Sequence, residues 1–452
     1  MDFGKWLMVA CLSLIMGCSN DHIFDRNDNE AKTASLYDSF LDGEVALSKL
    51  NLFMSELPKG GDLHHHYSGT IYVETYLEWL EEKQWGIFKE TLKISPAVIT
   101  KSTKTILTVT DLKNNGELYR KLLTLWSDKD FGNHCHVQPP PDTNFFNTFS
   151  FLKQISPLNH HRGFKVLKTR AIKENVSYIE TMVSQVGVKS SAFFTPGASQ
   201  KYIIRMRAAQ SQQEVDTILN ELASQLKTDA KFQGVIDGFQ KSLNKNHQGI
   251  DDNDFMMRYQ VYGVRVLDPL QVFCDLYSGF IAANTNKLVV GVNIVAPENN
   301  HVSLLDYTLH MRMFNYLNRQ YPKVNRALHA GELTLGVVRP KNLKFHINEA
   351  LNIAKSQRIG HGVDLPFESV PLELLEQLKS KAVIEINLTS NEFILGVKGQ
   401  EHPYLIYDSY GVPMIISTDD SGVSRNNLTN EYVLLASRYK PSYKKIKEYI
   451  YN

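Results

Sequence analysis

The 452-residue sequence predicts a (β/α)8 barrel of the TIM type, and three observations support this prediction. Eight short β-rich runs recur along the chain, amphipathic stretches separate most of them, and polar reactive side chains end several of the runs. Several runs are nearly continuously apolar, which is typical of parallel strands buried on both faces. Strands that alternate with helices indicate a parallel sheet covered by helices, and eight such units close into a barrel.

The eight predicted strands lie at residues 61–68, 176–182, 260–267, 288–295, 324–331, 357–362, 381–389 and 412–420. Stretches such as KNLKFHINEALNIAKS and PLELLEQLKS, between later strands, have the spacing of amphipathic helices. Two connections, over residues 70–175 and 183–259, are far longer than one βα unit requires, so we expect insertions after strands one and two.

Three further segments have a predicted conformation. The stretch QQEVDTILNELASQLK in the second insertion places apolar residues at helical spacing. In the first insertion, the prolines of NHCHVQPPPDTNFFNTF indicate irregular structure. We also expect a helix over residues 36–54, before the barrel.

The N-terminus has the layout of an export signal. Lys5 precedes an apolar run over residues 6–16, which is too short to span a bilayer. The ending LIMGC (residues 14–18) resembles the lipobox of bacterial lipoproteins, in which Cys18 is lipidated and becomes the first residue of the mature protein. A simple secretory signal cut nearby is the alternative.

This pattern divides the chain into a signal peptide over residues 1–17, a polar tether over 18–35 and a catalytic barrel over 36–452. We expect a periplasmic or cell-surface lipoprotein that touches the membrane only through its lipid anchor. Cys135 and Cys274 could pair in an oxidising compartment, and the sequence leaves that question open.

The overall charge argues against polyanionic partners. With 49 basic and 48 acidic residues, the chain has no global field that would attract nucleic acid or an anionic membrane. The histidines are more informative, because several of them cluster in short polar motifs.

The stretch PKGGDLHHHYSG puts His64, His65 and His66 on the first predicted strand. Residues two apart in a strand face the same way, so His64 and His66 point together and His65 points to the other side. The pair therefore has the arrangement of two metal ligands separated by a spacer.

Three later strands also end in reactive side chains. The fifth ends in HAGE, which contains His329 and Glu332, and the sixth ends in GHG, which contains His361. The eighth ends in TDD, which contains Asp419 and Asp420. In a barrel these strand ends surround one mouth, where active sites lie. Three imidazoles and a carboxylate would satisfy one Zn²⁺ ion and leave a position for water. The candidate ligands are His64, His66, His329 and Asp419.

Each motif also has a purely structural interpretation. His329 fits a hydrogen-bonded core histidine, the two aspartates fit a turn or a helix N-cap, and RIGHG fits a glycine-flanked turn. None of these interpretations explains why polar groups gather at the same ends of several strands, so we favour the metal site.

Five segments, LPKGGDLHHH, HAGE, RIGHG, TSNEF…HP and STDD, resemble in order and spacing the motifs of the adenosine deaminase family in the amidohydrolase superfamily. The resemblance runs from about Leu57 to Ser421. The opening MSELPKGGDLH, the long first insertion and KENVSYIE are most similar to the secreted branch, the adenosine deaminase growth factors. A two-metal amidohydrolase is disfavoured, because such enzymes usually have a bridging Lys where this chain reads VVGVNIVAPE.

The resemblance implies a role for each reactive residue. Glu332 would protonate the purine N1, His361 would orient the attacking water or take up its proton, and Asp420 would bind N7. The four ligands would hold one zinc ion, with Asp419 counted among the catalytic residues as well. Zinc lowers the pKa of bound water to roughly 7, and a general acid such as Glu332 contributes roughly 10²–10⁴ in rate.

Departures from the family pattern concern the substrate contacts. Ser68 stands where the intracellular deaminases have an acid that contacts the ribose. Ala296 stands where the family usually has a Gly whose N–H contacts N3, and Ser421 replaces a common Pro. These positions bear on which 6-aminopurine binds.

We therefore expect a zinc-dependent aminohydrolase that converts adenosine or 2′-deoxyadenosine to the inosine product and ammonia. Its partner would be a small purine nucleoside, and its oligomeric state stays open, a homodimer included. One alternative is a deaminase of another 6-aminopurine, such as adenine or a modified adenosine. The other is a non-catalytic surface protein that binds nucleosides or a partner on the same barrel.

Overall fold

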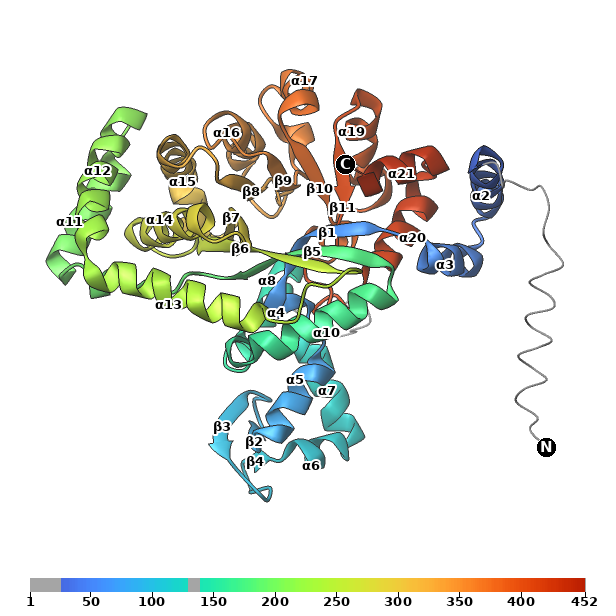
Figure 1. The fold of residues 1–452 in the computed structure, drawn as a ribbon, viewed down its shortest axis with the longest axis horizontal. Helices are drawn as coiled ribbons and strands as arrows, with labels where there is room; N and C mark the ends of the chain where they lie inside the picture. The colour runs from blue at the N-terminus through green and yellow to red at the C-terminus, as the bar shows by residue number, and fades with distance from the viewer. Residues whose placement is uncertain (1–25, 129–138, 452) are drawn as a thin grey trace.

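The computed structural model describes residues 26–128 and 139–451, and its centre is a sheet of eight parallel strands that forms a nearly closed barrel (Figure 1). The strands lie side by side in chain order, and every pairing between neighbours is parallel. They are β1 (Gly60–His66), β5 (Val176–Ser184), β6 (Met256–Val264), β7 (Val289–Val295), β8 (Asn325–Ala330), β9 (Arg358–His361), β10 (Val383–Ile386) and β11 (Met414–Ile416). The predicted (β/α)8 barrel is confirmed, with strand ends that differ from the prediction by a few residues.

The barrel closes where the last strand meets the first. The backbone N–H of His66 donates to the carbonyl oxygen of Asp419 (3.1 Å), and the N–H of Asp419 donates to the carbonyl of His64 (2.8 Å). The buried carboxylate of Asp62 adds to this seam by accepting hydrogen bonds from the backbone N–H and the hydroxyl of Thr418. The segments that close the barrel therefore also carry three of the predicted metal ligands.

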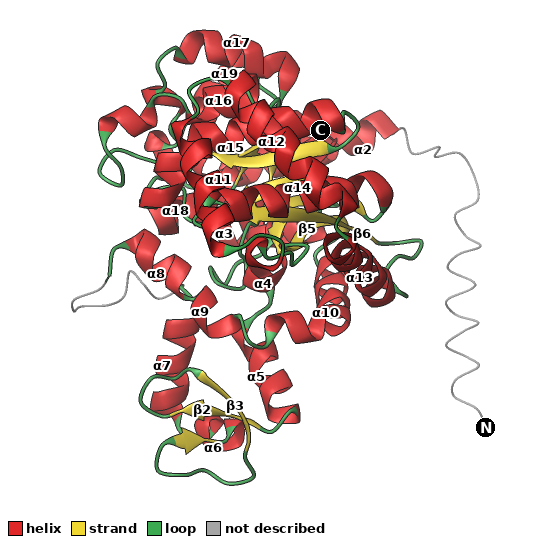
Figure 2. Ribbon diagram, turned by 90° about the vertical axis from the view of Figure 1, so that its left-hand side faces the viewer, coloured by secondary structure: helices red, strands yellow, loops and turns green. Residues whose placement is uncertain are grey.

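Helices surround the strands in the arrangement expected of this fold (Figure 2). They are α2 (Arg26–Leu41), α3 (Leu47–Glu56), α4 (Tyr67–Thr70), α5 (Val73–Glu82), α6 (Val109–Lys113), α7 (Gly116–Trp126), α8 (Pro141–Asn147), α9 (Phe149–Leu152), α10 (His160–Lys173), α11 (Pro196–Ala208), α12 (Gln212–Thr228), α13 (Ala230–His247), α14 (Pro269–Thr285), α15 (His301–Gln320), α16 (His346–Asn352), α17 (Pro371–Lys381), α18 (Leu388–Leu395), α19 (Tyr404–Tyr410), α20 (Leu428–Tyr439) and α21 (Tyr443–Tyr451). Short 3-10 helices are η2 (Ser156–Asn159), η3 (Ser190–Ala192), η4 (Pro340–Leu343), η5 (Leu365–Phe367) and η6 (Gly399–Glu401).

The helix predicted in the second insertion is present as α12. Ser211 caps it and forms a capping box with Glu214, which satisfies backbone N–H groups at the first turn. Its apolar stripe is buried as the spacing predicted, at Val215, Ile218, Leu219, Leu222 and Leu226. The helix is thus fixed by local capping and by burial of one face.

Two predictions of local structure were wrong. The single helix expected over residues 36–54 is two helices, α2 and α3, because Gly43 between them adopts a left-handed backbone (φ 63°) that interrupts the first. The proline run does not exclude a helix, since α8 begins at Pro141, where a proline is tolerated in the first turn.

The first insertion contains a unit that the strand pattern did not predict. It is a three-stranded antiparallel sheet made of β2 (Trp85–Phe88), β3 (Ile94–Val98) and β4 (Ile106–Leu107). With α5, α6 and α7 it projects from the barrel (Figures 1 and 2). The chain then returns, and α8 packs against α18 of the barrel.

Some predictions concern residues outside those described. The signal peptide over 1–17, the lipidation site Cys18 and the cysteine Cys135 belong to this group. Cys274 is buried in α14. Among the helices of residues 26–128 and 139–451, none has the length and apolar composition needed to cross a membrane.

Candidate metal centre and active site

The four predicted ligands converge at the mouth of the barrel. Nε2 of His66 lies 3.1 Å from Nε2 of His329 and 3.1 Å from Oδ1 of Asp419. Nε2 of His64 lies 3.4 Å from the same carboxylate oxygen. The four ligand atoms all lie within 4.8 Å of one another, so one ion could contact all of them.

The state of the imidazoles fits a cation at this point. Nδ1 of His64 lies 2.5 Å from a Glu385 oxygen and Nδ1 of His329 lies 2.9 Å from Oδ1 of Asn293, so both Nδ1 atoms act as donors. Their Nε2 lone pairs then face the convergence point, and Nε2 of His64 is buried with no hydrogen-bond partner among the described residues. Three imidazole nitrogens and one carboxylate are a donor set that suits Zn²⁺.

His65 lies on the opposite side of β1 from its two neighbours. Its Nδ1 is 2.9 Å from the hydroxyl oxygen of Thr181 on β5, and the ring is buried. The alternation along the strand thus separates the spacer from the ligands, as the sequence predicted.

Strained backbone conformations at two residues and the lack of a side chain at two glycines shape the mouth of the barrel. Asp419 (φ 59°) and His361 (φ 75°) adopt left-handed conformations, which cost non-glycine residues about 1–3 kcal/mol and concentrate at functional sites. A Cβ atom at Gly360 would lie 2.6 Å from Cε1 of His64, and one at Gly69 would lie 1.6 Å from Oδ1 of Asp420. Glycine is therefore required at both positions for these side chains to fit.

Glu332 is held by a buried acid that the sequence analysis did not single out. Glu298, after β7, accepts hydrogen bonds from the backbone N–H groups of Gly331 (3.0 Å) and Glu332 (2.9 Å). Burial opposes its ionisation, but Arg265 and His346 hold the pKa of Glu298 at about 2, so it is an anion. The carboxylate thereby fixes the HAGE loop.

The carboxyl group of Glu332 itself is in a different state. Burial, together with the charges of Asp419 and Glu298, raises the pKa of Glu332 well above its ordinary value. Its Oε1 lies 3.6 Å from Nε2 of His361. A protonated carboxyl at this place can act as an acid at neutral pH.

Three hydrogen bonds in series determine the orientation of His361, and their donors and acceptors can be assigned in one way only. The backbone N–H of Tyr404 donates to Nδ1 of His402 (3.1 Å), so Nε2 of His402 carries the proton and donates to Oδ1 of Asn391 (3.0 Å). The amide of Asn391 then donates to Nδ1 of His361 (2.9 Å). Burial lowers the pKa of His361 to about 3, and the neutral ring must carry its proton on Nε2. The motif TSNEF…HP therefore directs an N–H group of His361 into the mouth.

A cavity of about 330 Å³ opens beside this centre, within the size range of small-molecule sites. One wall carries the reactive side chains His66, His329, Glu332, His361, Asp419 and Asp420. The lining also includes an apolar wall from the first insertion and α18, with Phe145, Phe146, Phe149 and Ile394. None of the described residues that line the cavity is a lysine or an arginine.

The predicted substrate contacts also line this cavity. Ser68 lies on α4, directly after β1, and Ala296 follows β7 with a left-handed backbone (φ 84°) that favours glycine. Asp420 is buried, and burial with the charge of Asp419 raises its pKa well above the ordinary value. Gln185 and Tyr262 line the cavity too, and no motif in the sequence pointed to them.

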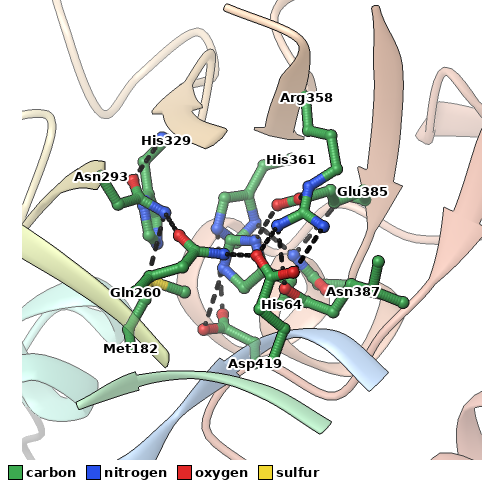
Figure 3. Close-up of polar contacts among 12 residues, drawn as sticks. His64, Met182, Gln260, Asn293, His329, Arg358, His361, Glu385, Asn387 and Asp419 are labelled. Atoms are coloured by element: carbon green, nitrogen blue, oxygen red, sulfur yellow. Dashed lines mark hydrogen bonds and ion pairs between the residues drawn. The ribbon is translucent and has the colours of Figure 1, made fainter. Parts of the chain in front are cut away.

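The residues that support the ligands were missed as well, and Figure 3 shows them around the imidazoles. Glu385, Asn293 and Gln260 are polar residues inside mostly apolar strands, and Arg358 is the first residue of β9. Such interruptions of an apolar run are the signal that could have identified them, because a buried polar group needs a partner.

A family model described as Adenosine deaminase matches residues 203–452. An adenosine deaminase from Clostridium kluyveri is 31% identical over 177 residues, which cover 38% of this chain and 47% of that protein. The chain thus spans about half of the length of this curated relative.

Two solved structures share the fold. An N6-mAMP deaminase from Arabidopsis has a TM-score of 0.54 at 18% identity, and the match covers 88% of this chain and 92% of that protein. An adenine deaminase from Arthrobacter aurescens has a TM-score of 0.51 at 14% identity, and the match covers 87% of this chain and 92% of that protein.

Proposed function

The chain belongs to the adenosine deaminase family, and from this premise we propose that it is a zinc-dependent aminohydrolase acting on adenosine or 2′-deoxyadenosine. The products would be inosine or 2′-deoxyinosine and ammonia. The observation that carries the proposal is the convergence of the four-ligand centre with Glu332, His361 and Asp420 on one cavity.

One zinc ion would be held by the four convergent ligands, His64, His66, His329 and Asp419. When bound, it would lower the pKa of a water molecule to about 7 and so supply a nucleophile near neutral pH. Neither Glu332 nor His361 is needed as a ligand, and both stay free for proton transfer and orientation.

The other residues of the cavity match the proton requirements of the reaction. Attack at C6 places negative charge on N1, and the protonated carboxyl of Glu332 would supply a proton there. The carboxyl of Asp420, with its raised pKa, would donate a hydrogen bond to N7. The Nε2–H group of His361 supports a role in orienting the attacking water rather than in taking up its proton.

The charge of the cavity supports a nucleoside or a free base over a nucleotide. A 5′-phosphate carries about two negative charges, and the described lining offers carboxyl groups without a lysine or arginine to pair with it. The aromatic wall of Phe145, Phe146 and Phe149 would pack against the face of a purine or the apolar side of a ribose.

These features bear differently on the two alternatives. A deaminase of adenine or of a modified adenosine would use the same reactive wall, and Ser68 and Ala296 are the positions that would set the preference. A non-catalytic binding protein would have no use for a protonated Glu332 beside a metal centre, so we disfavour it.

We also propose that the protein is exported. The support is the signal-like segment 1–17 with its lipobox-like end, together with the resemblance of MSELPKGGDLH and KENVSYIE to the secreted growth factor branch. Expression of the full chain should place it in the membrane fraction of an exporting host, and Cys18→Ser should release it. Retention of both proteins in the cytoplasm would contradict export.

The experiment that tests the activity is metal analysis of the purified protein combined with a panel of adenosine, 2′-deoxyadenosine, adenine, N6-methyladenosine and AMP. We expect about one zinc per chain, loss of absorbance in the adenine band with the two nucleosides, and little turnover of AMP. Zinc-loaded protein that deaminates none of the five compounds would show the enzyme proposal to be wrong.

A further inference from the structure

A chain of buried and partly buried hydrogen bonds and ion pairs links two of the candidate ligands through the inside of the barrel (Figure 3). We call it the interior chain, and it runs from His329 through Asn293, Gln260, Glu180, Arg358 and Glu385 to His64. Its members lie on β8, β7, β6, β5, β9, β10 and β1, a different strand for each. Of the members of the interior chain, His329 alone is among the residues that line the cavity.

The direction of these hydrogen bonds is set at Glu180. A carboxylate only accepts, so the amide nitrogen of Gln260 must donate to Glu180 (2.6 Å). The amide oxygen of Gln260 then faces Asn293 and accepts from its Nδ2 (2.9 Å). Oδ1 of Asn293 is left to accept from Nδ1 of His329 (2.9 Å), which turns the Nε2 lone pair of His329 toward the metal centre.

At the other end of the interior chain, the Nε2 lone pair of His64 is also turned toward the metal centre. Nε of Arg358 forms an ion pair with Oε1 of Glu385 (2.8 Å), and the guanidinium of the same residue bonds to Glu180. Glu385 in turn accepts from Nδ1 of His64, whose Nε2 also faces the metal centre. One cation therefore holds the two carboxylates that define the direction at each ligand.

Burial prevents the amides of this arrangement from exchanging their hydrogen-bond partners for water. Gln260 is 0% exposed and Asn293 is 1% exposed, so water cannot replace a lost partner. A buried polar group without a partner costs about 1–3 kcal/mol. Backbone N–H groups of Ile294 and His329 also donate to Oδ1 of Asn293, which agrees with the same orientation of that amide.

We propose that Gln260, Glu180 and Arg358, which bond to one another and to Asn293 and Glu385 rather than to a ligand, are positioning residues for the zinc site. Gln260 and Glu180 reinforce the orientation of the Asn293 amide that His329 requires, and Arg358 holds Glu385 in place against His64, so that both Nε2 lone pairs stay toward the ion. This inference rests on the proposed metal-dependent function and concerns zinc affinity, which is measured without a substrate.

The first test is Glu180→Gln, a change that conserves shape. The new amide can accept from Arg358 only by turning its own N–H groups toward the amide nitrogen of Gln260, so two donors meet. We expect zinc affinity to fall about 10–100-fold, the range for residues that support metal ligands. Gln260→Glu places two carboxylates side by side and should weaken zinc binding in the same range.

The decisive test is the double variant Glu180→Gln/Gln260→Glu, which exchanges the two side chains. The amide at position 180 would accept from Arg358 and donate to the carboxylate at position 260, which also accepts from Asn293. The direction at His329 is then restored with the same net charge and nearly the same volume. We expect the double variant to regain most of the zinc affinity of the native protein.

Zinc affinity is measured by competition with a coloured chelator, and the geometry of the site by the visible absorption of the cobalt-substituted protein. Met182→Leu is the matched control, because Sδ of Met182 accepts only a weak hydrogen bond from Nδ2 of Asn293 (3.2 Å). It should change affinity less than threefold. Circular dichroism of the zinc-free proteins verifies folding, and either single variant suffices if the other does not fold.

Three results would overturn the inference. Both folded single variants could retain native affinity, the folded double variant could stay as weak as the singles, or Met182→Leu could weaken binding as much as they do. If the native protein binds no zinc, the proposed function fails together with the inference. If it binds zinc and deaminates no purine, only the proposed function fails.

Discussion

The histidines at positions 64 to 66 show how far a single residue's role follows from its place on a strand. The alternation of side chains predicted that His65 would face away from its neighbours, and the structure places it against Thr181 instead of at the metal centre. We therefore predict that His64→Ala loses most of its bound zinc, whereas His65→Ala keeps nearly all of it. Metal analysis of the two purified variants provides the comparison, and equal loss in both would mean that His65 also supports the site.

Glu332 gives a second prediction about one side chain. Glu332→Gln keeps the shape and the backbone contacts to Glu298 but removes the proton that would reach N1. The rate should fall at least about 100-fold while the zinc content stays unchanged. Steady-state kinetics with adenosine and metal analysis of the same sample measure both quantities, and turnover within tenfold of the native rate would refute the assigned role.

Ala296 gives a prediction about backbone strain. Its left-handed conformation favours glycine, so Ala296→Gly should raise the free energy of unfolding by about 1 kcal/mol. Ala327→Gly, in the interior of β8 and outside the left-handed region, should lower it. Denaturant titration of both variants at one pH is the measurement, and a stabilising effect at both positions would contradict the strain argument.

The sequence predicts the role of a residue well where its position on one strand decides which way the side chain faces. It predicts the role poorly where contacts from several elements decide it. All four candidate ligands, Glu332 and His361 stand in local motifs at strand ends, so the sequence alone could single them out, and the structure brings them together. Glu298, His402 and Gln185 act through partners that are far away in the chain, and only the folded arrangement identifies them.

At the scale of whole elements, the buried parallel strands could be predicted because their apolar runs are strong and are punctuated by polar ends. Their limits were less accurate, because β1 and β10 turn into α4 and α18 within one or two residues. The small sheet of β2, β3 and β4 was missed, since its strands are short and only partly buried.

Helix α14 offers a prediction about pH. Burial raises the pKa of Asp275 to about 7, above its ordinary value of 3.8, although Gln185 and Gln271 donate hydrogen bonds to it. Between these two values the folded state binds a proton that the unfolded state releases, so the contribution of Asp275 to stability is present at low pH and is lost as the pH rises through 7.

This contribution can be isolated with Asp275→Asn, which removes the titration. The free energy of unfolding of the native protein, minus that of the variant, should decrease between pH 5 and pH 8. Urea titrations at both values measure it, and a difference that stays constant or increases would contradict the raised pKa.

For the whole molecule, the metal centre should contribute to stability as well as to chemistry. A ligand that binds only the folded state at about 100 times its Kd adds about 2.7 kcal/mol to the free energy of unfolding. Adding zinc to the metal-free protein should therefore raise the melting temperature by several degrees. His64→Ala is the control and should show a much smaller shift, and an equal shift in both proteins would indicate zinc binding elsewhere.

The seam between β11 and β1 has a consequence for how the protein is made. Asp62 and Thr418, which meet at this seam, are 356 residues apart in the sequence. While the chain leaves the ribosome, the first two candidate ligands, both histidines, exist long before the aspartate that completes the set has been synthesised. A zinc ion at the proposed site would therefore meet all four ligands only after the last strand has docked. A chain that lacks this strand presents only part of the set.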